Sequence, residues 1–143
     1  MSNGPDFCHT CDRLAQVVQG QGECKNGICT ITVDRSNIAA TLMGRRIRSE
    51  EILGIGLTFE GPDKAGRTLN TVEAALLPEE VNRFLFVLAH FGLTVTAMHN
   101  HWLFDQPHLI YLHAIAVGDP FQFAHAVAEA SKTLTVPVKP AKG

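Results

Sequence analysis

The chain has 143 residues, of which 45% are hydrophobic and 18% charged, and this composition suffices for one domain with a continuous core. Twelve Lys and Arg residues against fourteen Asp and Glu residues give a formal net charge of −2, and basic residues gather only at Arg45, Arg46 and Arg48. We therefore expect no nucleic-acid partner, because binding to a phosphate backbone needs a basic face. The N-terminal residues lack a signal-peptide pattern and no apolar window could span a bilayer, so we expect a cytoplasmic location and no membrane partner.

The first half of the chain is predicted to be rich in strands. Residues 12–19 have the apolar spacing of a short helix, which Gly20 would end. Asn26 and Gly27 form the strongest two-residue hairpin signal, inside a predicted strand pair over 23–33. Apolar runs bounded by turn residues predict further strands at 38–42, 54–59 and 69–76.

The second half is predicted to fold as helix, strand, strand and helix. Pro78 can open the first of these helices, and its apolar residues around 84–89 predict a homodimer contact or burial on two sides. Strands are predicted at 93–101 and 108–117, and Asp119 is a good N-cap for the last helix. This order predicts an α+β fold, in which helices pack on one face of an antiparallel or mixed sheet. We expect a cysteine-containing segment over 1–21, one domain over 22–134 and an irregular tail over 135–143.

Three histidines are predicted to share one face of the sheet. Period-two geometry puts His99 and His101 on the same side of their strand, with Cβ atoms roughly 7 Å apart. His113 comes close to this pair if the next strand runs antiparallel alongside. Three such histidines match the ligand count of a catalytic site for Zn²⁺ or another divalent transition metal. The other interpretation is that they are half-buried histidines hydrogen-bonded to backbone or water.

Four cysteines lie within the first thirty residues, which in a reducing cytoplasm favours metal ligands or redox thiols. Cys8 and Cys11 form a C-x2-C motif, while Cys24 and Cys29 flank the hairpin turn, so all four resemble a structural zinc-ribbon site. A disulfide between Cys24 and Cys29 is an alternative, because they face each other across the hairpin. Cys8 and Cys11 could instead form a redox dithiol, or all four thiols could stay free.

Three stretches of the second half carry a resemblance to a known family. They are Ala97-Met-His-Asn-His101, Asp105-Gln-Pro-His-Leu-Ile-Tyr-Leu-His113 and Gly118-Asp-Pro120. Together they resemble the central signature of the LppY/LpqO family, a bacterial domain of unknown function, and the likeness extends from about Gly22 to Leu134. The family often has a further histidine just before Gly-Asp-Pro, where this chain has Val117. Family members are typically exported lipoproteins, whereas this sequence shows no leader.

The resemblance also implies a role for Glu73, which aligns with an acidic residue that the family carries on the strand just before the helix that Pro78 opens. Glu73 is then a fourth metal ligand or a proton-transfer group, and the other interpretation is a solvated strand carboxylate. We therefore expect a small metal-binding domain, with zinc as its metal, whose biochemical role stays open. The alternatives are a metal-dependent hydrolase, in which Glu73 is the base, and a thiol redox protein that uses Cys8 and Cys11.

Overall fold

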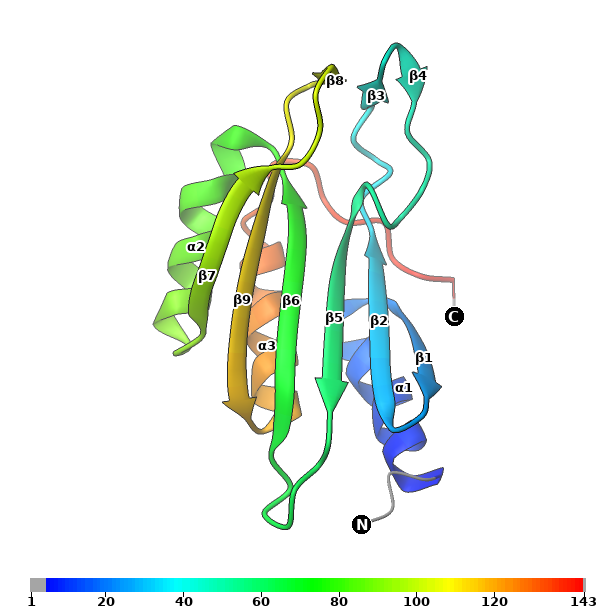
Figure 1. Ribbon diagram of the computed structural model, residues 1–143, viewed down its shortest axis with the longest axis vertical. Coiled ribbons are helices and arrows are strands. Elements are labelled where there is room, and N and C mark those ends of the chain that lie inside the picture. The colour runs from blue at the N-terminus through cyan, green and yellow to red at the C-terminus, as the bar shows by residue number, and fades with distance from the viewer. Residues whose placement is uncertain (1–4, 143) are drawn as a thin grey trace.

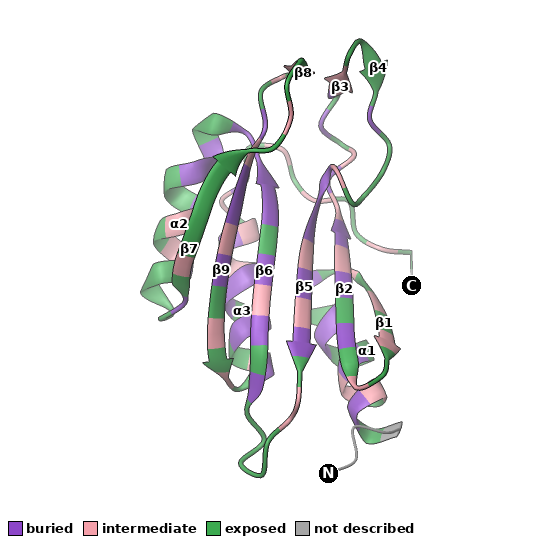
Figure 2. Ribbon diagram, viewed as in Figure 1, coloured by how far each residue is buried: buried purple, intermediate pink, exposed green. Residues whose placement is uncertain are grey.

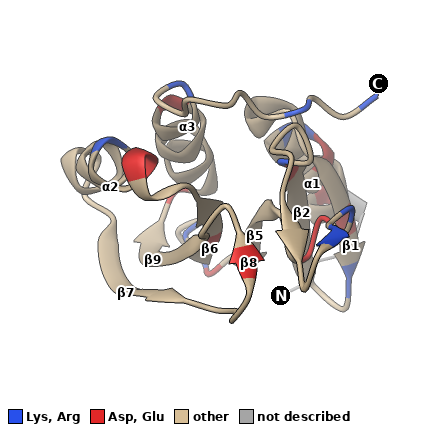
Figure 3. Cartoon of the chain, turned by 90° about the horizontal axis from the view of Figure 1, so that it is seen from above, with Lys and Arg blue, Asp and Glu red and all other residues tan. Residues whose placement is uncertain are grey.

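In the part of the chain that the structure describes, three helices lie on one face of a six-stranded sheet and none covers the other face (Figures 1 and 3). The computed structural model describes residues 5–142. Every neighbouring pair of strands in this sheet is antiparallel. The predicted α+β class, with helices packed on one face of the sheet, is confirmed.

The large sheet has the strand order β1-β2-β5-β6-β9-β7. Its strands are β1 (Gln21–Lys25), β2 (Ile28–Asp34), β5 (Gly54–Glu60), β6 (Thr68–Leu76), β7 (Thr94–Asn100) and β9 (Ile110–Gly118). Asn26 and Gly27 join β1 to β2 with the positive φ angles of 54° and 75° that a tight hairpin requires. The predicted hairpin is therefore confirmed, and so is the antiparallel pairing of the two histidine-bearing strands, β7 and β9.

A second, smaller sheet stands at one end of the large one. It has the order β4-β3-β8 and consists of β3 (Thr41–Leu42), β4 (Arg45–Arg46) and β8 (Asp105–Gln106). The strand predicted over 38–42 is thus only two residues long. The reason is local, because Met43 and Gly44 take positive φ angles of 52° and 79° and turn the chain back at once.

The helices are α1 (Pro5–Val18), α2 (Val81–His90) and α3 (Pro120–Ser131), and the 3₁₀ turn η1 (Pro78–Glu80) precedes α2. Helix α1 starts earlier than the sequence pattern indicated, because its first turns hold Cys11 and Phe7 in the core rather than a regular aliphatic stripe. Asp119 caps α3 as predicted, since its carboxylate accepts a hydrogen bond from the Phe121 N–H at 3.0 Å. Within the described residues, no helix has the length and hydropathy needed to cross a membrane.

The main core lies between the helices and the sheet. Alternate residues of β5 enter it, namely Ile55, Leu57 and Phe59, and the Phe59 ring packs edge-on against Phe123 of α3 at 5.8 Å between centroids. Figure 2 shows the resulting alternation of buried and more exposed residues along the central strands, whereas edge strand β7 is mostly exposed. The residues that alternate with the core positions therefore remain accessible on the open face of the sheet.

Candidate functional site on the open sheet face

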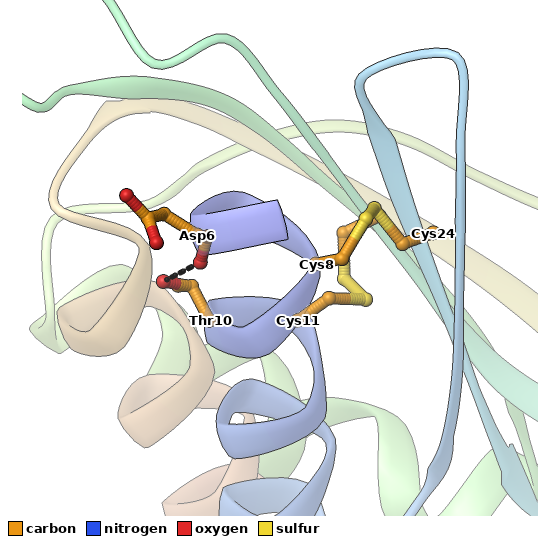
Figure 4. Close-up of a disulfide and its surroundings, with 6 residues drawn as sticks. Asp6, Cys8, Thr10, Cys11 and Cys24 are labelled. Carbon is orange, nitrogen blue, oxygen red and sulfur yellow. Dashed lines mark hydrogen bonds between the residues drawn. A yellow bond between two sulfur atoms is a disulfide. The ribbon is translucent and has the colours of Figure 1, made fainter. Parts of the chain in front are cut away.

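The four cysteines form two disulfides. Cys8 is bonded to Cys24, and Cys11 is bonded to Cys29, with Cα atoms 5.3 and 5.5 Å apart. Figure 4 shows both cysteines of α1 on the helix face that is turned toward the first hairpin. The predictions of a zinc-ribbon site, of a Cys8 and Cys11 redox dithiol, and of a Cys24 and Cys29 disulfide are therefore wrong.

The pairing follows from simple geometry. Cys8 and Cys11 are three residues apart in a helix and so lie on one face, while Cys24 and Cys29 are direct partners across the hairpin. When this helix face packs on the hairpin, the two helix cysteines lie opposite the two hairpin cysteines. The spacing of the cysteines is consistent with this pairing, but the pairing can be predicted only when 5–18 is recognised as one helix.

The histidine cluster lies on the open face, where β6, β9 and β7 run side by side. The Nε2 atom of His113 is 3.2 Å from Nε2 of His99 and 3.3 Å from Oε2 of Glu73. Strand register explains this convergence, because Glu73 pairs with His113 and His113 pairs with Ala97, two residues before His99. Three strands thus bring two imidazoles and one carboxylate to a common point.

The hydrogen bonds of His99 define its tautomer. The Nδ1 atom of His99 is 3.2 Å from the carbonyl oxygen of Asn100, which can only accept, so Nδ1 carries the proton. In neutral His99 the Nε2 atom is then an acceptor, and the N–H at Nε2 of His113 is its donor. The same N–H lies within reach of the Glu73 carboxylate. This proton of His113 therefore lies between an imidazole acceptor and a carboxylate.

His101 is not part of this cluster. Its ring packs against those of Trp102 and Tyr111, with centroids 4.6 and 4.9 Å away, and its centroid is 5.8 Å from that of His99. The Trp102 indole donates to the Tyr111 hydroxyl at 2.9 Å, and the hydroxyl donates to the carbonyl of Ile52. Burial raises the pKa of Tyr111; the Trp102 hydrogen bond opposes this shift, and the charge of Glu73 adds to it. Tyr111 therefore stays neutral and forms an aromatic wall with Trp102.

A hollow of about 380 Å³ opens beside Glu73 and His113. Its lining combines four threonines with four apolar residues, namely Thr30, Thr58, Thr71 and Thr96 with Leu57, Val72, Ala114 and Ile115. Gly56 is the register partner of Glu73, and a Cβ atom added at Gly56 would meet no atom within 4 Å. The absence of a side chain at Gly56 thus leaves space directly next to the carboxylate.

The metal-binding function expected from the sequence is also wrong. The cysteines are consumed in disulfides, and across residues 5–142 no group of three or more His, Cys, Asp or Glu side chains is arranged to hold a metal ion. The prediction of a metal-dependent hydrolase is therefore wrong as well. What the structure provides is a disulfide-stabilised domain, in which His99, His113 and Glu73 converge while His101 lies to one side.

The sequence reasoning missed two groups that lie beside the histidine cluster. The first is Tyr111, although it lies two residues before His113 and so shares its face. The second is the pair of Gly56 and the threonine hydroxyls, where Thr58 and Thr71 are hydrogen-bonded to each other across β5 and β6. Strand parity could have indicated Tyr111, but Gly56 needed the pairing of β5 with β6.

Comparison with known proteins adds a family to this geometry. Neither the curated proteins nor the solved structures contain a match to this chain. The sequence profile of one family, described as Domain of Unknown Function (DUF1259), matches residues 12–133. That range includes the helix from Asp12 onward, the whole large sheet, α2 and α3. Because the match extends over most of the chain, this protein belongs to the DUF1259 family.

Proposed function

We propose that the protein binds a small ligand rich in hydroxyl or amino groups on its open sheet face, and that His113 exchanges a proton with this ligand. The observation that carries the proposal is the position of His113 Nε2, within 3.3 Å of Glu73 and 3.2 Å of His99, at the wall of the hollow. A carboxylate beside an imidazole accepts a hydrogen bond from it and orients the ring, which is the arrangement of a general acid and base.

A purely structural role explains this cluster less well. Glu73 and His113 are each partly exposed, and an ion pair exposed to water contributes only about 0–1 kcal/mol to stability. Four threonines lie in the lining of the neighbouring hollow, beside its apolar residues. The threonine hydroxyls offer hydrogen bonds to a polar ligand, and apolar residues of the lining such as Ile115 add apolar contacts.

The test uses p-nitrophenyl acetate, a small ester that an unprotonated imidazole cleaves. We expect the protein to release nitrophenolate faster than an equal concentration of free histidine. His113→Gln removes the imidazole and should lower this rate by at least tenfold, in line with the roughly 10²–10⁴-fold effect of general acid–base groups. Gly56→Val should lower it as well, because Gly56 lines the hollow and a Cβ atom added there meets no other atom within 4 Å, so the larger side chain takes up space beside Glu73.

His125, on the outer side of α3, provides the matched control. His125→Gln removes one imidazole from the surface and should leave the rate unchanged. If His125→Gln and His113→Gln have equal effects, the cleavage comes from surface histidines in general and the proposal fails. A protein that is no faster than free histidine fails the test in the same way.

We also propose that the chain falls within the LppY/LpqO group. Support comes from the His-Asn-His motif, from the strand that ends in His113, and from the Gly-Asp-Pro motif whose Asp119 caps α3. An alignment in which the three motifs occur together in the same proteins, with an acidic residue at the position of Glu73, would support this assignment. Independent occurrence of the motifs would count against it.

The two disulfides lead us to propose an oxidising compartment, in place of the cytoplasmic location expected from the sequence. Disulfides persist in such compartments and are rare where glutathione keeps thiols reduced. Thiol trapping in cells of the source organism tests this, because alkylation before lysis labels only free thiols. We expect Cys8, Cys11, Cys24 and Cys29 to escape the label, and four labelled thiols would place the protein in a reducing compartment.

A further inference from the structure

Three large apolar side chains project into solvent from the end of the small sheet. Met43, Leu103 and Phe104 are 75%, 72% and 73% exposed, and we call them the apolar tip. Met43 follows β3, and Phe104 precedes β8. These two strands are neighbours in the small sheet at the top of Figure 1. Large apolar groups gathered at such exposure are typical of a surface that contacts a partner or a membrane.

The backbone holds the apolar tip outward in a defined shape. Met43 and Phe104 have positive φ angles of 52° and 65°, a conformation that costs free energy for bulky side chains. A hydrogen bond from the Met43 N–H to the Phe104 carbonyl, at 3.1 Å, ties the two loops together. The Asp105 carboxylate accepts from the Leu109 N–H at 2.9 Å and fixes the base of the second loop. The exposure is thus built into the fold and is not a consequence of a loose loop.

Three arginines lie close to Met43 in the sequence. Arg45, Arg46 and Arg48 follow Met43 directly, and all three are exposed. The acidic residue nearest the apolar tip along the chain is Asp105 of β8, and its side chain is only 5% exposed and contacts His108. Glu50 lines a different hollow together with Lys139. The segment after Met43 therefore exposes three arginines before its first acidic residues, Glu50 and Glu51.

We propose that the apolar tip docks onto an anionic lipid surface. Met43, Leu103 and Phe104 enter the boundary between headgroups and acyl chains, and the arginines contact lipid phosphates. A second copy of the chain fits this surface less well. A symmetric contact of tip on tip would bring the two arginine clusters together, and like charges at an interface repel.

Vesicle sedimentation tests the proposal with the full chain. We expect binding to large unilamellar vesicles of equal parts phosphatidylglycerol and phosphatidylcholine, weaker binding at high salt, and little binding to phosphatidylcholine alone. Replacing both Arg45 and Arg48 by Gln should lower the partition coefficient on the anionic vesicles by roughly tenfold or more. Equal binding to both kinds of vesicle, or none to either, overturns the proposal.

A second variant removes the apolar groups in a way that suits the backbone. Asn tolerates positive φ, and an Asn-Gly pair favours the turn at Met43 and Gly44, so Met43→Asn with Phe104→Asn should keep or raise the melting temperature. The same variant should lose vesicle binding at least tenfold. Val117→Thr, at an equally exposed apolar residue of β9, is the control and should bind like the wild type.

Two outcomes of this second experiment overturn the proposal. The first is a Met43→Asn and Phe104→Asn variant that binds vesicles like the wild type. The second is a wild type that dimerises without vesicles while the variant is monomeric, because the apolar tip would then contact a second copy. A variant with a lowered melting temperature would assign a structural role to the apolar tip. The two arginine substitutions then decide whether lipid binding exists at all.

Discussion

Arg35 and Glu80 form a fully buried ion pair, in which the guanidinium donates two hydrogen bonds to the carboxylate at 2.7 and 2.9 Å. Arg35 also donates to the carbonyls of Ala75 and Val136. Glu80 accepts from the backbone N–H groups of Leu77, Thr135 and Val136. The pair therefore joins the end of β2, the turn before α2 and the C-terminal tail in one network.

This network makes the stability of the protein dependent on acid. Burial alone would raise the pKa of Glu80, but the hydrogen bonds from Arg35, Leu77 and Val136 outweigh it and lower the pKa to about 2. Because the folded pKa lies below the unfolded one, the carboxylate stabilises the fold above about pH 4.5 and this stabilisation is lost as the pH falls toward 2. The contribution is about 3 kcal/mol.

Urea unfolding at a series of pH values measures this loss. The wild type should lose stability steeply between about pH 5 and pH 2, whereas Glu80→Gln should start about 3–5 kcal/mol lower at pH 7 and show a flatter profile. Substitution of Glu79, which is exposed and precedes Glu80, should leave the pH profile unchanged. A Glu80→Gln profile parallel to that of the wild type would contradict the assignment.

The two disulfides should be reduced in a fixed order. Cys11 and Cys29 are fully buried, while Cys8 and Cys24 are partly accessible, so a thiol reductant reaches the outer bond first. We expect limited treatment with dithiothreitol, followed by alkylation and peptide mass spectrometry, to label Cys8 and Cys24 before the inner pair. Early labelling of Cys11 would contradict the burial of the inner bond.

Removing each disulfide should also cost a different amount of stability. Both bonds close similar loops, with sequence separations of 16 and 18, so the chain-entropy loss is about 3 kcal/mol for each. Replacing Cys11 and Cys29 by Ala should cost more than replacing Cys8 and Cys24, because it also leaves a cavity in the core. Chemical unfolding of the two double variants compares these costs, and equal losses would argue against the cavity.

The tautomer of His99 provides a spectroscopic prediction. Long-range proton–nitrogen correlation spectra, recorded well above pH 7, should show His99 with its proton on Nδ1, because this atom donates to the Asn100 carbonyl. Exposed imidazoles such as that of His125 should show the proton mainly on Nε2, and they serve as the reference. A proton on Nε2 of neutral His99 would remove the acceptor of the His113 hydrogen bond.

A homodimer through α2 stays a prediction. Phe84 and Leu88 of this helix are buried in the core, but Phe86 is 70% exposed and stacks on His90. We expect sedimentation velocity to show a dimer that Phe86→Ser converts to a monomer at unchanged melting temperature. A wild type that is monomeric at high concentration would show that α2 has no partner copy.

Local signals were sufficient for much of the fold. The Asn26 and Gly27 turn and the Asp119 cap act within a few residues, and the sequence predicted both correctly. The small sheet could not be predicted in this way. It pairs Thr41 with Gln106, which are 65 residues apart, and two-residue strands have no periodicity of their own.

The candidate site shows the same division. Strand parity brought His99 and His113 to one face, but Tyr111 and Trp102 hold His101 to the side through packing that spacing does not encode. The prediction for the cysteines depended on an assumed reducing compartment, and that assumption favoured metal over disulfides. Nothing in the sequence alone weighs these two chemistries for the same four thiols.

The two disulfides also fix the register of the first hairpin. Strand β1 is an edge of the large sheet, and it has a neighbouring strand on only one side to fix its pairing. A slip of one residue would turn Cys24 to the opposite face of the hairpin from Cys29, and a slip of two would separate them along the strands. One helix face could then reach only one of them. Both disulfides can therefore form only when the first hairpin has its native strand register. Once formed, they hold the two strands in that register.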